Sequence, residues 1–195
     1  MKEVFFMRHG RTSENAANVI MGWDDPPLSE ESRAEILSIK PYVVRPDVVF
    51  SSDLRRASET ARLLFPNREI VFLPQLRERY YGRLQGKPRS ALGEFASWGI
   101  DRPDEEDVFT KAGGESLSTV RVRAEQALNL IRGVDARNVV VVSHGGLINF
   151  FVSIMLSQAK IGHPLGNLHY HKFTFDSQGN VVDCLLYTSD AADEE

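Results

Sequence analysis

The sequence predicts an α/β fold with a mostly parallel central sheet and helices on both faces. Short apolar runs alternate along the chain with segments of helical character, which is typical of strand–helix–strand units. The clearest runs lie at residues 4–7, 48–50 and 139–142, and the last of these is four consecutive valines. Such uninterrupted apolar runs are typical of strands that are buried on both faces.

The first half of the chain carries signals for two helices and a third strand. Ser29 is a suitable N-cap for a helix with Ser32 at its third position. Residues 51–53 are expected to cap a second helix that runs to about Leu64, and residues 70–73 to form a strand. The apolar face expected for the first helix consists of Ala34, Ile36, Leu37, Ile39 and Tyr42.

The second half of the chain continues the alternation. Residues 117–132 and 147–156 are expected to form helices. Residues 169–175 are expected to form a strand that a turn joins to a last strand. The apolar face of the first of these helices consists of Val120, Ala124, Ala127, Leu128 and Ile131.

Residues 1–183 are expected to form a single domain. Within it, the segment 77–114 lacks clean periodicity and is rich in charge and glycine, so we interpret it as a lid over the carboxyl ends of the strands. Residues 184–195 resemble the translation of a transposon-type sequencing adapter and are interpreted as a non-native tail. The alternative is a natural strand followed by an acidic terminus.

Composition and charge argue against several classes of function. Of the 195 residues, 42% are hydrophobic and 26% charged, and the formal net charge is −4. Because the chain has no long run of lysine and arginine, neither nucleic acid nor a membrane surface is an expected partner. Neither a signal peptide nor a membrane span is expected. Cys184 is the only cysteine, so a disulfide within the chain is impossible, and a cytoplasmic location fits.

Four short segments carry the side chains that phosphoryl transfer requires, namely residues 8–10, 54–57, 76–79 and 143–146. The first and last of them directly follow strands, and ligands of such sheets bind at the carboxyl ends of the strands. Arginine holds a phosphate through a rigid bidentate fork. A neutral imidazole can attack phosphorus near neutral pH, and a carboxylic acid can protonate the departing alkoxide. Gathered at one edge of the sheet, these groups would form a phosphomonoester site.

The sequence resembles the histidine phosphatase superfamily, also called phosphoglycerate mutase-like, over about residues 2–176. Each shared motif is weak alone, but their order along the chain is specific. The motifs are R-H-G (8–10), G-W-x-D-x-P-L-S (22–29), S-S-D-L-x-R-A (51–57), L-R-E-R-x-Y-G (76–82), G-G-E-S (113–116) and S-H-G-G (143–146). The resemblance implies chemistry that needs neither a metal nor a cofactor.

Roles within this family carry over to the matching positions. The resemblance implies that His9 is the nucleophile that accepts the phosphoryl group, and that Arg8, Arg56 and His144 hold the phosphate. It implies that Glu78 donates a proton to the leaving group and later activates water. Further residues implied at the substrate or phosphate are Gly10, Asn15, Gly22, Tyr81, Arg89, Glu115 and Gly145.

Five of these further positions carry specific expectations. Gly10 and Gly145 would let the backbone approach the anion closely. Tyr81 and Arg89 fall where mutases hold the carboxylate of their substrate. Glu115 is either a helix-start residue or a substrate contact.

Hydrolysis of a small phosphorylated metabolite, such as a sugar phosphate or a glycolytic acid, is the expected activity. The first alternative is a phosphoglycerate mutase, but mutases carry an arginine pair after Trp98, where this chain has Gly99 and Ile100. Fewer cations in the lid favour water as the phosphoryl acceptor. Arg11, where many members have glutamate, adds positive charge and favours more anionic substrates. The second alternative is a binding module that keeps the phosphate pocket without turnover.

Ordinary structural roles compete with the catalytic ones at two positions. Glu78 could form a surface salt bridge with Arg77 or Arg79, and His144 could be a hydrogen-bonded core residue. Arg55, next to Arg56, is expected to be a solvated helix charge.

Three other histidines, His163, His169 and His171, are considered as metal ligands. His169 and His171 would share one face of a strand, but no third ligand lies at a recognisable spacing, so no metal site is expected. The assembly is expected to be a monomer or a homodimer.

Overall fold

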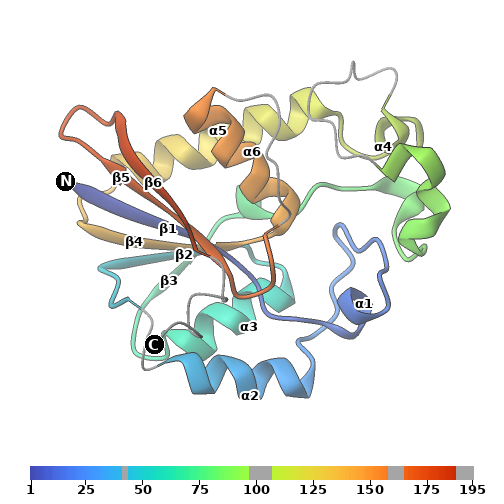
Figure 1. Cartoon of the computed structure of the whole chain (residues 1–195), viewed down its shortest axis with the longest axis horizontal. Helices are drawn as coiled ribbons and strands as arrows, with labels where there is room; N and C mark the ends of the chain where they lie inside the picture. Colours follow the sequence, from blue (N-terminus) through green and yellow to red (C-terminus); the bar gives the residue numbers. More distant parts are fainter. Residues whose placement is uncertain (41–43, 97–106, 158–164, 188–195) are drawn as a thin grey trace.

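A six-stranded sheet forms the centre of the computed structural model, which describes residues 1–40, 44–96, 107–157 and 165–187 (Figure 1). The strands are β1 (Lys2–Arg8), β2 (Val48–Ser51), β3 (Ile70–Phe72), β4 (Asn138–Ser143), β5 (Tyr170–Phe175) and β6 (Val181–Tyr187). Their order in the sheet is β3-β2-β4-β1-β5-β6. The first four strands pair in parallel, whereas β5 is antiparallel to both of its neighbours. The predicted α/β fold with a mostly parallel sheet is confirmed.

Helices cover both faces of this sheet (Figure 1). One face carries α2 (Glu30–Ile39) and α3 (Arg55–Leu64), and the other carries α5 (Leu117–Gly133) and α6 (Gly145–Leu156). Shorter elements lie in the connections: α1 (Ser13–Ala16), α4 (Val108–Lys111), η2 (Pro74–Leu76), η3 (Gly82–Leu84) and η4 (Arg89–Ala96).

Strand β1 shows why the apolar runs are uninterrupted. Val4 and Phe6 belong to the hydrophobic cluster that includes residues of α5 and α6. Phe5 and Met7 belong to the cluster that includes residues of α2 and α3. Because successive side chains of a strand point to opposite faces, a strand with helices on both sides needs an apolar residue at every position.

The start of α2 is as predicted, but its buried face is narrower. The hydroxyl of Ser29 accepts a hydrogen bond from the backbone N–H of Ser32 at 3.2 Å. Ser32 and Ile36 are buried, whereas Ala34 and Leu37 are exposed. The helix is therefore buried mainly along one line of residues spaced four apart, so the predicted apolar face was too wide.

The prediction that residues 51–53 cap α3 is wrong. The N-cap of α3 is Leu54, which makes no side-chain capping hydrogen bond. The N–H of Arg55 instead donates to the carboxylate of Asp25 at 2.5 Å, so a distant loop satisfies this helix end. Tertiary contacts of this kind leave no local trace in the sequence.

In the second half of the chain, α5 buries all five predicted apolar positions and follows the N-cap Ser116. Helix α6 begins at Gly145, two residues before its predicted start. Strand β6 extends past residue 183, and Cys184 pairs there with Phe173 of β5. The start of the segment that we interpret as a non-native tail thus occupies a strand position.

The predicted lid segment, 77–114, has a small hydrophobic cluster of its own. Tyr81, Leu92 and Phe109 pack there with Ile20 from the N-terminal part of the chain. Of the positions discussed above, Tyr42, Trp98, Gly99, Ile100 and His163 lie outside the described residues. Within the described ranges, no helix has the length and apolar character needed to cross a bilayer.

Candidate active site

His9 and His144 lie side by side because they follow two adjacent parallel strands. The last pair in the register of β1 and β4 is Arg8 with Ser143, so the next residue of each strand is a histidine. The N–H of His9 donates to the carbonyl of Ser143 at 3.0 Å. The two imidazole rings are buried, with centroids 5.0 Å apart.

The contacts of His9 define which ring nitrogen carries its proton. Nδ1 lies 2.6 Å from the carbonyl oxygen of Gly10, which can only accept, so Nδ1 is protonated in the neutral ring. Nε2 then holds the lone pair, and it accepts from Nε of Arg56 at 3.1 Å. Burial, reinforced by the charges of Arg56 and Arg8, holds the pKa of His9 well below its ordinary value. The imidazole is therefore neutral and nucleophilic at Nε2.

Arg56 lies in the first turn of α3 and is buried, unlike its neighbour. Its Nη1 donates to the carbonyl of Asp24 at 2.7 Å, and its Nη2 to the carbonyl of Gly22 at 2.8 Å. Burial lowers its pKa to about 10, so the guanidinium stays charged at neutral pH. Gly22 thus contacts Arg56 through its carbonyl, and its backbone lies in the left-handed region at φ +55°.

His144 is not a fully satisfied core histidine. Its Nε2 lies 2.9 Å from the hydroxyl of Ser52, but among the described residues its buried Nδ1 has no hydrogen-bond partner. Burial first, and then the charge of Arg56, holds its pKa well below the ordinary value. A buried polar atom without a partner in a cationic pocket is suited to an anionic ligand.

Backbone N–H groups hold the carboxylate of Glu78, and the side chains of its two arginine neighbours pair elsewhere. Its carboxylate accepts from the N–H of Gly146 at 3.0 Å, two residues after His144, and from the N–H of Arg79 at 2.8 Å. The side chain of Arg77 pairs with Asp53 at 2.6 Å, and that of Arg79 pairs with Asp107. The surface salt bridge considered for Glu78 is therefore absent from the described part of the structure.

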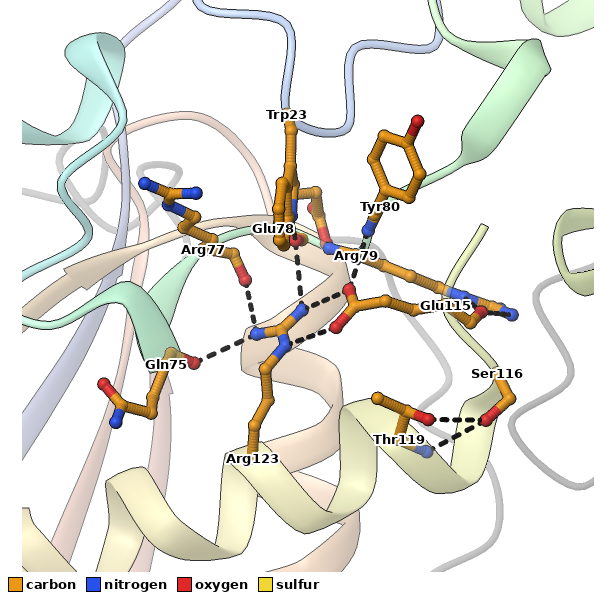
Figure 2. Close-up of polar contacts among 10 residues, drawn as sticks. All are labelled: Trp23, Gln75, Arg77, Glu78, Arg79, Tyr80, Glu115, Ser116, Thr119 and Arg123. Carbon is orange, nitrogen blue, oxygen red and sulfur yellow. Dashed lines mark hydrogen bonds and ion pairs between the residues drawn. The ribbon is translucent and has the colours of Figure 1, made fainter. Parts of the chain in front are cut away.

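The backbone around Glu78 is held by Arg123 of α5 (Figure 2). Nη1 of Arg123 donates to the carbonyls of Gln75 (3.0 Å) and Arg77 (2.7 Å). Nη2 donates to the carbonyl of Glu78 at 3.0 Å, and the guanidinium also forms two 2.8 Å hydrogen bonds with the carboxylate of Glu115. We call Arg123 and Glu115, with these three carbonyls, the Arg123 brace.

Glu115 belongs to this brace, and its expected substrate contact stays a prediction. One carboxylate oxygen accepts only from Arg123, and the other accepts from Arg123 and from the N–H of Tyr80 at 2.8 Å (Figure 2). Glu115 lies at the start of α5, directly before the N-cap Ser116. Trp23 adds a further contact, since its indole N–H donates to the carbonyl of Glu78 at 2.7 Å.

Gly10 and Gly146 are both needed to avoid close contacts. A Cβ on Gly10 would lie 2.5 Å from the hydroxyl of Ser32, and the N–H of Gly10 already donates to Thr60 at 3.0 Å. The glycine therefore admits α2, and its amide is engaged, in contrast to the expected approach to an anion. A Cβ on Gly146 would lie 2.5 Å from the carboxylate of Glu78. At Gly145 the nearest atom would be Nε of Arg8 at 3.4 Å, so this position borders the side chain of Arg8.

A cavity of about 440 Å³ opens beside Arg8. We call it the arginine cavity, and its lining consists of Arg8, Arg11, Asn15, Ala16, Asn18, Val19, Arg89 and Asn167. Tyr81 is not among the lining residues. It is buried with its ring 4.5 Å from that of Phe109 and, because of burial, has a pKa well above the ordinary value.

Several contacts of the site were not anticipated. Asn167 donates to the carbonyl of His9 at 2.8 Å, and Ser52 contacts His144. Ser52 lies in the S-S-D-L-x-R-A motif, which could have singled it out, whereas the sequence around Asn167 carries no comparable signal. Arg123 sits on an amphipathic helix among other charges, and only its contacts distinguish it. No group of three potential metal ligands occurs among the described residues.

Comparison with known proteins agrees with this geometry. The sequence pattern of the histidine phosphatase superfamily (branch 1) matches residues 4–187. A metal-independent phosphoserine phosphatase from Arabidopsis thaliana is 30% identical over 190 residues, which cover 93% of this chain and 79% of that protein. A 2,3-bisphosphoglycerate-dependent phosphoglycerate mutase from Bifidobacterium longum is 37% identical over 101 residues, which cover 47% of this chain and only 41% of the mutase.

Solved structures show the same fold. TTHB049 from Thermus thermophilus is 27% identical with a TM-score of 0.68, over 95% of this chain and 99% of that one. A mycobacterial glucosyl-3-phosphoglycerate phosphatase superposes with a TM-score of 0.79 at 24% identity, over 96% of this chain and 98% of its own. The family pattern spans almost the whole sheet, and the histidine pair lies at the carboxyl ends of the two central strands. This chain therefore belongs to branch 1 of the histidine phosphatase superfamily.

Proposed function

We propose that the protein hydrolyses small phosphomonoesters through a phosphohistidine on His9, without a metal. The observation that carries the proposal is the arrangement around Nε2 of His9. This nitrogen is unprotonated, its ring is buried against His144, and the guanidinium of Arg56 is 3.1 Å away. A nucleophile and two groups suited to bind phosphate thus share one small space.

In the first step, Nε2 of His9 attacks phosphorus and the bond from phosphorus to the ester oxygen breaks. Arg8 and Arg56 neutralise charge on the phosphoryl oxygens. The leaving oxygen takes a proton from the carboxyl group of Glu78. The carboxylate accepts a hydrogen bond from the N–H of Gly146, two residues after His144, which supports this assignment.

In the second step, a water molecule gives a proton to Glu78 and its oxygen attacks the phosphohistidine. The N–P bond breaks, which releases inorganic phosphate and restores the neutral ring of His9. Nδ1 of His144 has no partner among the described residues, so it can donate to a phosphoryl oxygen once protonated. A bound dianion opposes the lowering of the pKa of His144, and we therefore expect proton uptake when phosphate binds.

Turnover of p-nitrophenyl phosphate tests this proposal. We expect turnover that persists in EDTA and disappears in the His9→Ala variant. We also expect the original protein to form a phosphoenzyme and the His9→Ala variant to form none. Absence of turnover across a panel of phosphorylated metabolites would instead indicate a phosphate-binding module. Conversion of 3-phosphoglycerate to its 2-isomer would indicate a mutase, which the 101-residue match to mutases keeps as the second candidate.

A further inference from the structure

The motif at residues 22–29 places a tryptophan beside the proposed proton donor. The indole N–H of Trp23 donates to the carbonyl of Glu78 at 2.7 Å, and Nη2 of Arg123 donates to the same oxygen at 3.0 Å. The backbone of Glu78 lies between Trp23 and Arg123 (Figure 2). A carbonyl oxygen has two lone pairs, and these two donors can occupy both of them. The position of Glu78 thus depends on donors from two distant parts of the chain.

The indole ring of Trp23 is held in one orientation by its neighbours. Cζ of Arg77 lies 4.9 Å from the centre of the ring, and the ring of Tyr80 lies 5.3 Å from it. Arg77 is itself fixed by two hydrogen bonds to the carboxylate of Asp53, at 2.7 and 2.6 Å. Although Trp23 is 37% exposed, this packing directs its N–H at the carbonyl of Glu78.

The backbone of Trp23 is held by Arg56. Its Nη1 and Nη2 donate at 2.7 and 2.8 Å to the carbonyls of the two residues that flank Trp23, Asp24 and Gly22. Nε of the same guanidinium donates to Nε2 of His9 at 3.1 Å. The guanidinium that contacts the proposed nucleophile therefore also fixes the loop whose indole contacts the proposed proton donor.

Gln85 fixes the same loop from another direction. Its side-chain oxygen accepts from the N–H of Trp23 at 2.8 Å, and its side-chain nitrogen donates to the carboxylate of Asp24 at 3.0 Å. Gln85 directly follows η3, whereas Arg56 lies in α3. Because two elements hold this loop, a shift of the main chain at Trp23 would break several hydrogen bonds at once.

We propose that Trp23 is a positioning residue that links phosphate binding by Arg56 to the placement of Glu78. The indole N–H keeps the main chain of Glu78 where its carboxyl group can reach the leaving oxygen. A general acid acts only within hydrogen-bond reach of the proton acceptor, so a displaced carboxyl group loses much of its effect. Substrates with a poor leaving group, which needs the proton, therefore depend on Trp23. This inference rests on the proposed role of Glu78 as the proton donor.

Two aryl phosphates that differ in the basicity of the leaving group test this link. Phenyl phosphate lacks the nitro group of p-nitrophenyl phosphate, so its leaving group is much poorer and needs the proton. Trp23→Phe keeps an aromatic ring and removes the indole N–H. This variant should lower kcat/KM on phenyl phosphate by about tenfold, a part of the roughly 100-fold or more that a positioned acid contributes. On p-nitrophenyl phosphate the loss should stay below about threefold, because that leaving group needs little protonation.

Phe72→Leu is the matched control for the loss of an exposed aromatic side chain. Phe72 is 36% exposed, and Cζ of Arg62 lies 5.0 Å from the centre of its ring, so it matches Trp23 in exposure and in its arginine contact. It should leave the ratio of the two kcat/KM values unchanged. Gln85→Met should change the ratio in the same direction as Trp23→Phe, by a smaller factor.

Binding and turnover separate the expected result from a general defect. The inhibition constant of inorganic phosphate should be unchanged in Trp23→Phe, because the side chains proposed to hold phosphate remain. Equal losses on both aryl phosphates, or no loss on either, would overturn the positioning role while leaving the phosphatase proposal intact.

Magnetic resonance tests the link without turnover. The chain has two tryptophans, Trp23 and Trp98, and Trp23→Phe identifies the indole N–H signal of Trp23 in ¹H–¹⁵N spectra. Saturating inorganic phosphate should shift this signal. Arg56→Lys keeps the positive charge but cannot bridge both flanking carbonyls, so the shift should become smaller in that variant.

The two proposals can fail separately. If no substrate is turned over, the catalytic proposal fails, and the phosphate titration still decides whether Trp23 is linked to Arg56. A signal of Trp23 that does not move in the original protein, or that moves equally in Arg56→Lys, would overturn the link.

Discussion

Arg55 and Arg56 are adjacent in the sequence, yet their environments differ completely. Arg55 is solvent-exposed and forms an i, i+4 pair with Glu59, as expected for a solvated helix charge. Arg56 is buried against Nε2 of His9. The helix turns by about 100° between them, so only one of the two can face the strand ends.

Replacing these two arginines one at a time should show that only the buried one affects activity. Arg56→Gln should lower kcat/KM on p-nitrophenyl phosphate by about 100-fold or more, since it removes a proposed donor to the phosphoryl oxygens. It also removes a cation beside His9, so the pKa of His9 should rise toward its ordinary value. The acid limb of the pH–rate profile should then move to higher pH. Unchanged kinetics in Arg56→Gln would contradict the assigned role, and Arg55→Gln is the control.

At the scale of elements, the Arg123 brace connects α5 to the segment that carries Glu78 (Figure 2). Its guanidinium binds three backbone carbonyls and the carboxylate of Glu115. It thereby holds the backbone of Glu78, the proposed proton donor. Arg123 is therefore a positioning residue.

Arg123→Met should lower kcat by about 10- to 100-fold, because displacing a catalytic group by a fraction of an ångström is costly. The loss should be larger for an alkyl phosphate than for p-nitrophenyl phosphate, whose good leaving group needs little proton donation. Arg121→Met, at an exposed position of the same helix, is the control. Equal losses on both substrates would indicate a structural defect and not a displaced Glu78.

Two helical glycines provide a matched test of the space around Glu78. Gly146→Ala should reduce kcat, because the added methyl group would meet the carboxylate of Glu78 at 2.5 Å. Gly133→Ala at the end of α5 meets nothing within 4 Å and should leave kcat unchanged while raising stability by up to about 1 kcal/mol. Kinetics and thermal unfolding of both variants check this, and full activity of Gly146→Ala would contradict the placement of Glu78.

For the whole molecule, His171 makes stability depend on pH. It is buried in β5, and neither ring nitrogen has a partner among the described residues. Burial lowers its pKa from 6.5 to about 4. Between about pH 6.5 and pH 4 the unfolded chain binds a proton on His171 that the folded protein does not bind. The free energy of unfolding should therefore decrease as the pH falls from about 6.5 toward 4.

Because of this histidine, the free energy of unfolding should be lower at pH 5 than at pH 7 by up to about 2 kcal/mol. His171→Phe should remove that part of the pH dependence, so the variant should lose less stability over this range than the original protein. Denaturant unfolding at both pH values measures the difference. An identical pH dependence in the two proteins would show that His171 is protonated without cost.

The sequence by itself determined the elements and the chemical composition of the site. Apolar runs located the buried strands, and both histidine motifs directly follow such runs, which placed them at the carboxyl ends of strands. The period of apolar residues in α5 was sufficient to define its buried face. These features depend on local pattern, which the chain carries at each position.

Only the tertiary structure decided which partner each polar group would take. Asp25 at the start of α3, Ser32 beside Gly10 and Asn167 on the carbonyl of His9 are all contacts between residues far apart in the chain. The same holds for Glu115, whose carboxylate turned out to bind Arg123. Hydrogen bonds act over about 3 Å, so sequence spacing cannot specify them until packing has fixed the backbone positions of both partners.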